Sequence, residues 1–302
     1  MPGRQSSKGR ISLTTALAFR HPPFPQSHLM SATSRQAGSS LSKNFDLWWQ
    51  FTVRAVEMRH RGSHLGIFWT VLNPLLSLGM YVIVFGFIGK SHFNAIPNET
   101  PLDYTLAVFL GLIIFQITAE VIAVSPSYII SNPNFVKKVV FPLSALPLSN
   151  VSALWFHFTI SFTLLLLACA AVSHPPPLSG LLWMPVLITP HIFLTIGLSW
   201  FLSAFGVFFR DISQVATFIT QVVLYSSSVF FPVKLIKQVP GLWMVLKWNP
   251  MLHTVDLSRR ALLWDQPVEL IPVVYTWICG LTILGLGYWF FKKWQPAFAD
   301  VI

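Results

Sequence analysis

The sequence predicts an all-α, polytopic integral membrane protein with six membrane-spanning helices. Six long apolar stretches lie along the 302 residues, at positions 66–89, 104–124, 145–172, 181–209, 212–233 and 270–291. Each can cross a hydrocarbon layer of roughly 30 Å, because about 20 helical residues suffice for that distance. Charged residues make up only 10% of the chain, and the mean hydropathy is +0.62. A typical soluble domain has about 25% charged residues, so the bilayer must accommodate this apolar surface.

Residues 1–43 are predicted to form a disordered N-terminal arm. They contain no acidic residue and many Ser, Pro, Arg and Gln, a composition that cannot bury enough apolar surface to fold. A signal peptide fits poorly, because the apolar run at 11–19 is interrupted by Thr and is followed by Arg20 and several prolines. Met30 is an alternative start of the protein.

Residues 44–62 are predicted to form an amphipathic helix that lies in the membrane interface. One face, at three- and four-residue spacing, carries Phe45, Trp48, Trp49, Thr52, Val53 and Val56. Since the chain offers no soluble domain for this face to pack against, the inner membrane surface is the favoured position. An ordinary amphipathic core helix is the alternative.

The distribution of positive charge predicts that both termini are cytoplasmic. Most Lys and Arg residues fall in the arm, the second and fourth loops and the tail. The fifth loop, residues 234–269, would then lie outside. It is rich in Trp, Leu and Met, and its stretch 238–246 is too short to span a bilayer. This loop is predicted to be a re-entrant or interfacial helical hairpin, and a membrane-lying loop without a role in transport is the alternative.

Signatures of catalysis are not found in the sequence. Gly89, Lys90 and Ser91 resemble the end of a phosphate-binding loop, but the first glycine of that motif is replaced by Val84. Cys169 and Cys279 have no His or Cys neighbour at ligand spacing. We therefore expect a protein that is not an enzyme and that carries no metal or cofactor of its own.

Three ionisable residues lie inside the predicted spans. Glu120 is expected to pair with a basic residue near the cytoplasmic surface or to reach that surface itself. His157 and His191 are expected to be neutral, packed side chains, and a proton relay is the less favoured interpretation.

The fifth span has a polar face. Uncharged polar residues recur at three- and four-residue spacing, at Gln214, Thr217, Thr220, Gln221, Tyr225 and Ser228. The aromatic residues Phe218, Phe230 and Phe231 are interleaved with them. Amides, hydroxyls and aromatic rings suit sugars, whereas packing between helices through small polar contacts is the alternative.

Several segments, taken in order, resemble the type-2 ABC transporter permeases that export polysaccharides. They are RHRGSHLGIFWTVLNPLL at 59–76, SNPNFVKKVVFPLSALPL at 131–148, FFRDISQ at 208–214, FPVKLIKQVP at 231–240 and KWNPMLHTVDLSRRALL at 247–263. The resemblance covers roughly residues 44–295, so residues 63–295 are expected to form the type-2 transmembrane domain.

The resemblance implies roles for particular residues. The loop after the second span would couple the permease to an ATPase through Asn132, Pro133, Lys137, Lys138 and Pro142. The less favoured alternative is that Lys137 and Lys138 only determine topology. The translocation path would be lined by Trp69, Tyr81, Gln214, Phe218, Gln221 and Tyr225. Asp211, between the fourth and fifth spans, is expected to cap the fifth helix.

The predicted function is that of the permease subunit of an ABC exporter that moves lipid-linked polysaccharide outward across a bacterial inner membrane. The implied partners are a second copy of the chain, a separate ATP-binding subunit that holds ATP and Mg²⁺, the lipid-linked polysaccharide and membrane lipids, but no nucleic acid. A type-2 permease for a drug or small lipid is the nearer alternative. A membrane-embedded transferase or a proton-coupled carrier would need several clustered acids or histidines.

Overall fold

The computed structural model describes residues 40–59, 65–89, 92–93, 95–138, 142–172, 175–209 and 211–302, and for residues 40–44, 67, 89 and 137–138 it describes only the backbone. Every regular element in these residues is helical, which confirms the all-α class. Residues 1–39 of the predicted arm, with the alternative start Met30 among them, lie outside the described residues. Residues 40–43, which we had assigned to the arm, are helical.

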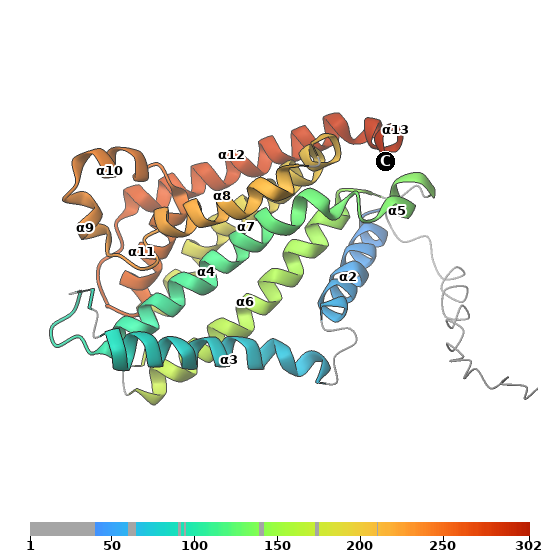
Figure 1. The fold of residues 1–302 in the computed structure, drawn as a ribbon. Helices are drawn as coiled ribbons and strands as arrows, with labels where there is room; N and C mark the ends of the chain where they lie inside the picture. The colour runs from blue at the N-terminus through green and yellow to red at the C-terminus, as the bar shows by residue number, and fades with distance from the viewer. Residues whose placement is uncertain are drawn as a thin grey trace, which may run out of the picture. The chain divides into compact units, whose positions relative to one another are not determined.

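The helices follow one another along the chain with short connections (Figure 1). Their bounds are α2 Ser40–Met58, α3 Trp69–Tyr81, α4 Pro101–Tyr128, α5 Pro133–Lys138, α6 Ala145–Ala171, α7 Leu178–Phe208, α8 Ile212–Ser226, α9 Val233–Lys237, α10 Pro240–Leu246, α11 Pro250–Leu262, α12 Leu270–Trp294 and α13 Phe298–Val301. A 3₁₀ turn, Gly66–Phe68, precedes α3, and a π-helix, Val82–Gly89, extends it.

Five of these helical segments are long and apolar enough to cross a membrane. They are Trp69–Ile88, Pro101–Tyr128, Ala145–Ala171, Leu178–Phe208 and Leu270–Val301. The chain is therefore a multi-pass membrane protein. The expected fifth span, 212–233, differs from the structure, because α8 ends at Ser226. Its 15 residues cover only about 22 Å at 1.5 Å per residue.

The early end of α8 has a local cause. Ser227 Oγ donates to the carbonyl of Val223, and Ser228 adopts a φ of 57°. A left-handed residue cannot continue an α-helix. Residues 233–262 then form α9, α10 and α11.

Two helix starts show how the sequence sets the boundaries. Thr100 and Asp103 form a reciprocal capping box at the start of α4, and the side chain of Asn249 accepts a hydrogen bond from the Met251 amide at the start of α11. Both satisfy backbone N–H groups that a helix start leaves unpaired. The capping role expected of Asp211 is wrong: this residue stands at the N-cap of α8, but its side chain makes no capping hydrogen bond.

Helix α4 lies at the centre of the packing. It contacts α6, α7 and α8 along its length, and its residues Val108, Ile114 and Val121 are completely buried. Apolar side chains of α4, α6 and α7 form the largest hydrophobic cluster of the described chain. By contrast, α3 buries little of its surface within the chain.

Helices α7 and α12 approach each other through glycines. A Cβ atom added at Gly197 would lie 2.3 Å from the carbonyl oxygen of Ile283, and one at Gly287 would lie 2.0 Å from that of Gly197. Small residues allow such close approach of transmembrane helices. The α7–α12 pair is therefore held by backbone contact, which leaves no room for a larger side chain.

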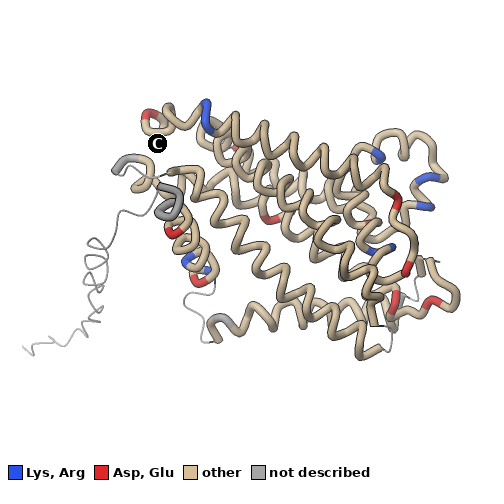
Figure 2. Tube along the Cα trace, turned by 180° about the vertical axis from the view of Figure 1, so that it is seen from behind, with Lys and Arg blue, Asp and Glu red and all other residues tan. Residues whose placement is uncertain are grey.

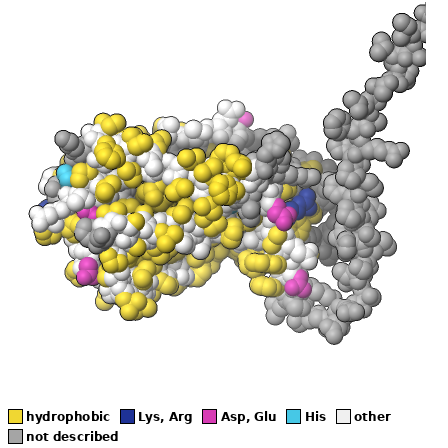
Figure 3. All heavy atoms as spheres, turned by 90° about the horizontal axis from the view of Figure 1, so that it is seen from below, with side chains coloured by type: hydrophobic (Ala, Val, Ile, Leu, Met, Phe, Trp, Pro, Cys, Tyr) yellow, Lys and Arg dark blue, Asp and Glu magenta, His cyan; other side chains and the backbone are white. Residues whose placement is uncertain are grey.

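Charge and exposed apolar surface are separated. Described charged residues gather at the two ends of the helices, and few lie between them (Figure 2). The side of the molecule on which α3 lies in Figure 1 is largely covered by hydrophobic side chains (Figure 3). Exposed apolar residues of this first span include Leu75, Leu76, Met80 and Phe87. Such a surface is suited to lipid.

Candidate functional site

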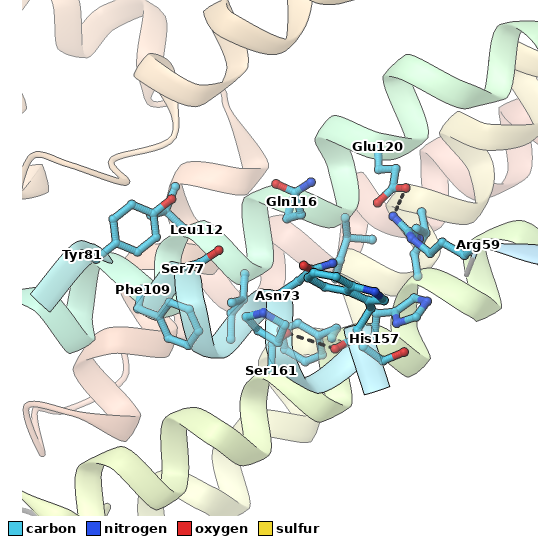
Figure 4. Close-up of a pocket in the computed structure, with 17 residues that line it drawn as sticks. Arg59, Asn73, Ser77, Tyr81, Phe109, Leu112, Gln116, Glu120, His157 and Ser161 are labelled. Atoms are coloured by element: carbon cyan, nitrogen blue, oxygen red, sulfur yellow. Dashed lines mark hydrogen bonds and ion pairs between the residues drawn. The ribbon is translucent and has the colours of Figure 1, made fainter. Parts of the chain in front are cut away.

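A cavity of about 310 Å³ lies between α3, α4 and α6 (Figure 4). We call it the slot. Apolar side chains from all three helices line it together with amides, hydroxyls, a histidine and one ion pair. Polar groups are costly inside a membrane and usually mark a pathway or a binding site. The slot is therefore the candidate functional site.

The α3 wall of the slot is a single stripe of side chains. Trp69, Asn73, Ser77 and Tyr81 follow at four-residue steps and all line the cavity, as expected for one face of a helix. The stripe extends about 18 Å at 1.5 Å per residue. It has an aromatic ring at each end and an amide and a hydroxyl between them. Sequence reasoning had assigned Trp69 and Tyr81 to the translocation path but had not identified Asn73 and Ser77.

The facing walls come from α4 and α6. Their polar contributions are Gln116 and Glu120 from α4, and His157 and Ser161 from α6. The remaining lining residues of these two helices are apolar, at Phe109, Leu112, Ile113, Ile117, Leu154 and Phe158. The polar residues again recur at helical spacing, so that each helix presents one mixed face to the cavity.

An ion pair closes one end of the slot. Arg59, just after α2, donates to the carboxylate of Glu120, as Figure 4 shows, while Tyr81 lies at the other end. The expectation that Glu120 pairs with a basic residue is confirmed. The partner comes from the end of the N-terminal helix, which ties the entry of the first span to α4.

The two histidines have different environments. His191 is buried, its Nε2 lies 3.2 Å from Thr118 Oγ1, and its ring meets the edge of Trp155. This agrees with a packed side chain. His157 instead lines the slot. Within the described residues, no three His, Cys, Asp or Glu side chains come together as a metal site.

Helix α8 presents a second polar surface. Gln214, Thr217, Phe218, Gln221 and Tyr225 are all exposed, with 65% of Phe218 and 64% of Tyr225 accessible. At 100° per residue these five side chains form one strip, which we call the α8 strip. Two residues of the predicted face lie elsewhere: Thr220 is half-buried and donates to the Ala216 carbonyl, and Ser228 is buried.

The slot and the α8 strip are separate in one chain. None of the α8 residues lines the slot, whose walls belong to α3, α4 and α6 together with Arg59. The six residues assigned to the translocation path thus fall into two groups, with Trp69 and Tyr81 on the slot and the other four on the α8 strip.

A comparison with known families identifies the kind of protein. The sequence profile of the ABC-2 type transporter family matches residues 46–263, from α2 through α11. The chain belongs to the ABC-2 type transporter family. This confirms the resemblance found in the sequence.

Individual members of the ABC-2 type transporter family are similar over most of their length. The chain is 28% identical over 260 residues to the O-antigen export system permease protein RfbA of Klebsiella pneumoniae, covering 85% of this chain and 95% of that protein. RfbA of Myxococcus xanthus is 26% identical over 250 residues, with 82% and 92% covered. The polysialic acid transport protein KpsM of Escherichia coli is 23% identical over 248 residues, with 81% and 92% covered.

The expected coupling residues of this ABC-2 type transporter lie around α5. Asn132 Nδ2 donates to the Tyr128 carbonyl at the end of α4, and the short helix α5 begins at Pro133. Phe135 meets the ring of Phe51 edge-on, with centroids 5.2 Å apart, so that α5 contacts α2. The side chains of Lys137 and Lys138 lie outside the described residues. Pro142, half-buried, leads into α6.

Sequence reasoning also missed a buried arginine of this ABC-2 type chain. Arg259 was counted among the loop charges, but its side chain is 1% exposed. It donates to the carbonyls of Ala107 in α4 and of Ser228 and Val229 beyond α8, at 2.7, 2.6 and 2.5 Å. Gly111 makes room for it, since a Cβ there would lie 2.4 Å from Arg259 Nη2. Arg259 therefore fixes the end of α8 to α4 and α11.

A helical periodicity in the sequence could have located Arg259. Leu252, Val255, Arg259 and Leu262 are buried at spacings of three and four, so the arginine occupies the apolar stripe of α11. Burial lowers the pKa of Arg259 to about 10, which leaves it protonated at neutral pH. Burial also raises the pKa of Asp256, one turn before Arg260 on the same helix. The positive charge of Arg260 lowers this pKa, but the effect of burial is larger.

Proposed function

We propose that the chain is the membrane-spanning permease subunit of an ABC exporter that moves lipid-linked polysaccharide outward across a bacterial inner membrane. The relatives named for O-antigen export and polysialic acid transport support this class of substrate. The observation that carries the proposal is that two membrane helices present amides, hydroxyls and aromatic rings outside the apolar core of the chain.

The α8 strip cannot face hydrocarbon without a large cost. An unsatisfied amide in an apolar medium costs about 4–8 kcal/mol, and Gln214 and Gln221 both lie exposed on a helix whose adjoining side carries exposed Val215, Ile219 and Val222. The apolar side suits lipid. The polar strip suits water, a polyhydroxylated substrate or another protein chain.

A second copy of the chain would complete the passage. Two α8 strips facing each other across a two-fold axis would enclose a path lined by amides and aromatic rings, and each chain would add its own slot. Glycans combine apolar C–H faces with many hydroxyl groups. Aromatic rings bind the former and amides the latter, so the same surface serves successive sugar units.

The energy would come from a separate ABC subunit that binds ATP and Mg²⁺. Both termini, α2 and α5 would lie on the cytoplasmic side, where α5 would dock on the ATPase. Because α5 contacts α2, and because Arg59 follows α2 and pairs with Glu120, a movement at α5 would reach the slot and the first span. This is conformational coupling through rigid helices.

Co-purification with the ATPase tests the proposal. The tagged chain is co-expressed with its ABC ATP-binding subunit, isolated in mild detergent and assayed for ATP turnover. We expect the wild type to retain the ATPase and a Lys137→Glu/Lys138→Glu variant to lose it or its turnover. A Lys234→Glu/Lys237→Glu variant is the matched control, because it makes the same charge change in α9.

The control separates a coupling role from a general effect of charge. If the α9 variant loses the ATPase to the same degree as the α5 variant, the α5 docking surface is refuted. If the wild type neither binds an ABC subunit nor supports glycan export in vesicles that contain both proteins, the exporter function itself is wrong.

A further inference from the structure

We infer that the translocation path is built for uncharged sugars, and that the slot binds them within each subunit. This inference rests on the proposed function and narrows its substrate to neutral glycans, as opposed to acidic polymers such as polysialic acid. The argument comes from the charges along the path and from the side chains that line the slot.

The membrane helices offer no cation to an anionic polymer. Between Trp69 and Ser226, the helices α3, α4, α6, α7 and α8 contain no Lys or Arg, and α12 has only Lys292 and Lys293 in its last turn. Pores for anions and phosphate are lined by Arg or Lys. The α8 strip and the three helical walls of the slot are uncharged except for Glu120, whose charge is balanced by Arg59.

Two described arginines near the path are already engaged. Among the described residues, Arg59 is the one cation that lines the slot, and its charge is balanced by Glu120. Arg259 is buried and directs its N–H groups at three backbone carbonyls. A carboxylate carried by each sugar unit would therefore lose hydration without gaining a partner, which is unfavourable inside a membrane.

What the slot does offer matches a polyol. Asn73 and Gln116 can each donate and accept hydrogen bonds, and the hydroxyl of Ser77 can do both. The hydroxyl of Ser161 donates to the His157 carbonyl and can still accept. Trp69 supplies a flat aromatic surface for the C–H face of a sugar ring. The charges of Arg59 and Glu120, the two charged groups among the described lining residues, balance each other, so this pair favours no anion over a neutral hydroxylated chain.

Glycan binding to the purified chain tests this without any ATPase. Saturation-transfer NMR would compare a neutral glucan oligosaccharide with an oligosialic acid of equal length, in neutral detergent at physiological salt. We expect binding of the neutral oligomer and at least tenfold weaker binding of the acidic one.

Asn73→Leu and Gln116→Leu should each weaken neutral binding about three- to tenfold, the effect of one lost hydrogen bond. Gln238→Leu, in an exposed turn before α10, is the matched control.

A charge introduced into the slot provides the converse test. Ser77→Lys should increase binding of the oligosialic acid, and this gain should fall with added salt because it is electrostatic. Ser77→Gln, which adds similar bulk without charge, should show no such gain. Ser77 is preferred to Gln116 for this change, because a lysine at 116 would stand one turn from Glu120 and pair with it.

Failure of this inference can be told apart from failure of the proposed function. Equal or stronger binding of the acidic oligomer, absence of binding by either oligomer, or equal losses with Gln238→Leu would each overturn the inference. Export in vesicles with the ATPase is scored separately. A chain that binds neutral oligosaccharide through Asn73 and Gln116 but exports no glycan would retain the binding site and refute the exporter.

Discussion

At the Arg59–Glu120 pair, a single carboxylate in an apolar span is balanced by an arginine 61 positions earlier in the chain. Arg59→Glu would place two acids together, and we expect it to destabilise the fold by about 1.5–3 kcal/mol, the range for hydrogen bonds to charged groups. Glu120→Arg should act similarly. The charge-swapped double variant should recover most of the loss, as read from melting temperatures in detergent. Additive losses in the double variant would show that the two residues are not coupled.

Whether a residue could be foreseen depended on its sequence neighbours. Glu120 was recognisable because it is the one acid in a long apolar stretch, and a charge there must find a partner. Arg259 follows Asp256 and precedes Arg260, so it looks like part of a charged loop. Its burial depends on Gly111 and on the carbonyls beyond α8. Those groups lie far away in sequence, so the apolar stripe of α11 could indicate the burial of Arg259 but not its partners.

Among the elements, α7 and α12 give the clearest prediction, because their contact is between backbones. Gly287→Ala would place a methyl group against the carbonyl of Gly197, and backbone cannot move aside as a side chain can. We expect a loss of about 1–3 kcal/mol, as for other overpacked sites, measured as a lower melting temperature. Gly285→Ala, two residues away with nothing within 4 Å, should be neutral or slightly stabilising. Equal losses at both positions would mean that the close backbone approach at Gly287 is not what holds this pair, because helix propensity favours Ala over Gly at both sites.

The spans were predictable as elements, but their ends were less so. Hydropathy locates long apolar helices well, since only a helix satisfies its backbone in lipid. Helix α8 stops seven residues before the expected end at 233. Tertiary contacts add to the local effect of Ser227 and Ser228: Asn249 donates to the Ser226 carbonyl, and Arg259 donates to the carbonyls of Ser228 and Val229. These two residues of the α11 segment replace the hydrogen bonds that a longer helix would make.

For the whole molecule, the polar strip of α8 lies outside the core of its own chain, and in the proposed dimer the second copy would cover it. Gln221 and Ile219 test this, because both are exposed but point about 160° apart on α8. In a Cys169→Ala/Cys279→Ser background, Gln221→Cys should form a dimer with a short bifunctional maleimide in native membranes, and Ile219→Cys should not. Neutral glycan added in excess should reduce the Gln221→Cys product if the strips enclose the passage. Preferential cross-linking of Ile219→Cys would place the apolar side of α8 at the interface. The amides would then face away from it at a desolvation cost, and the arrangement of two facing α8 strips would have to be abandoned.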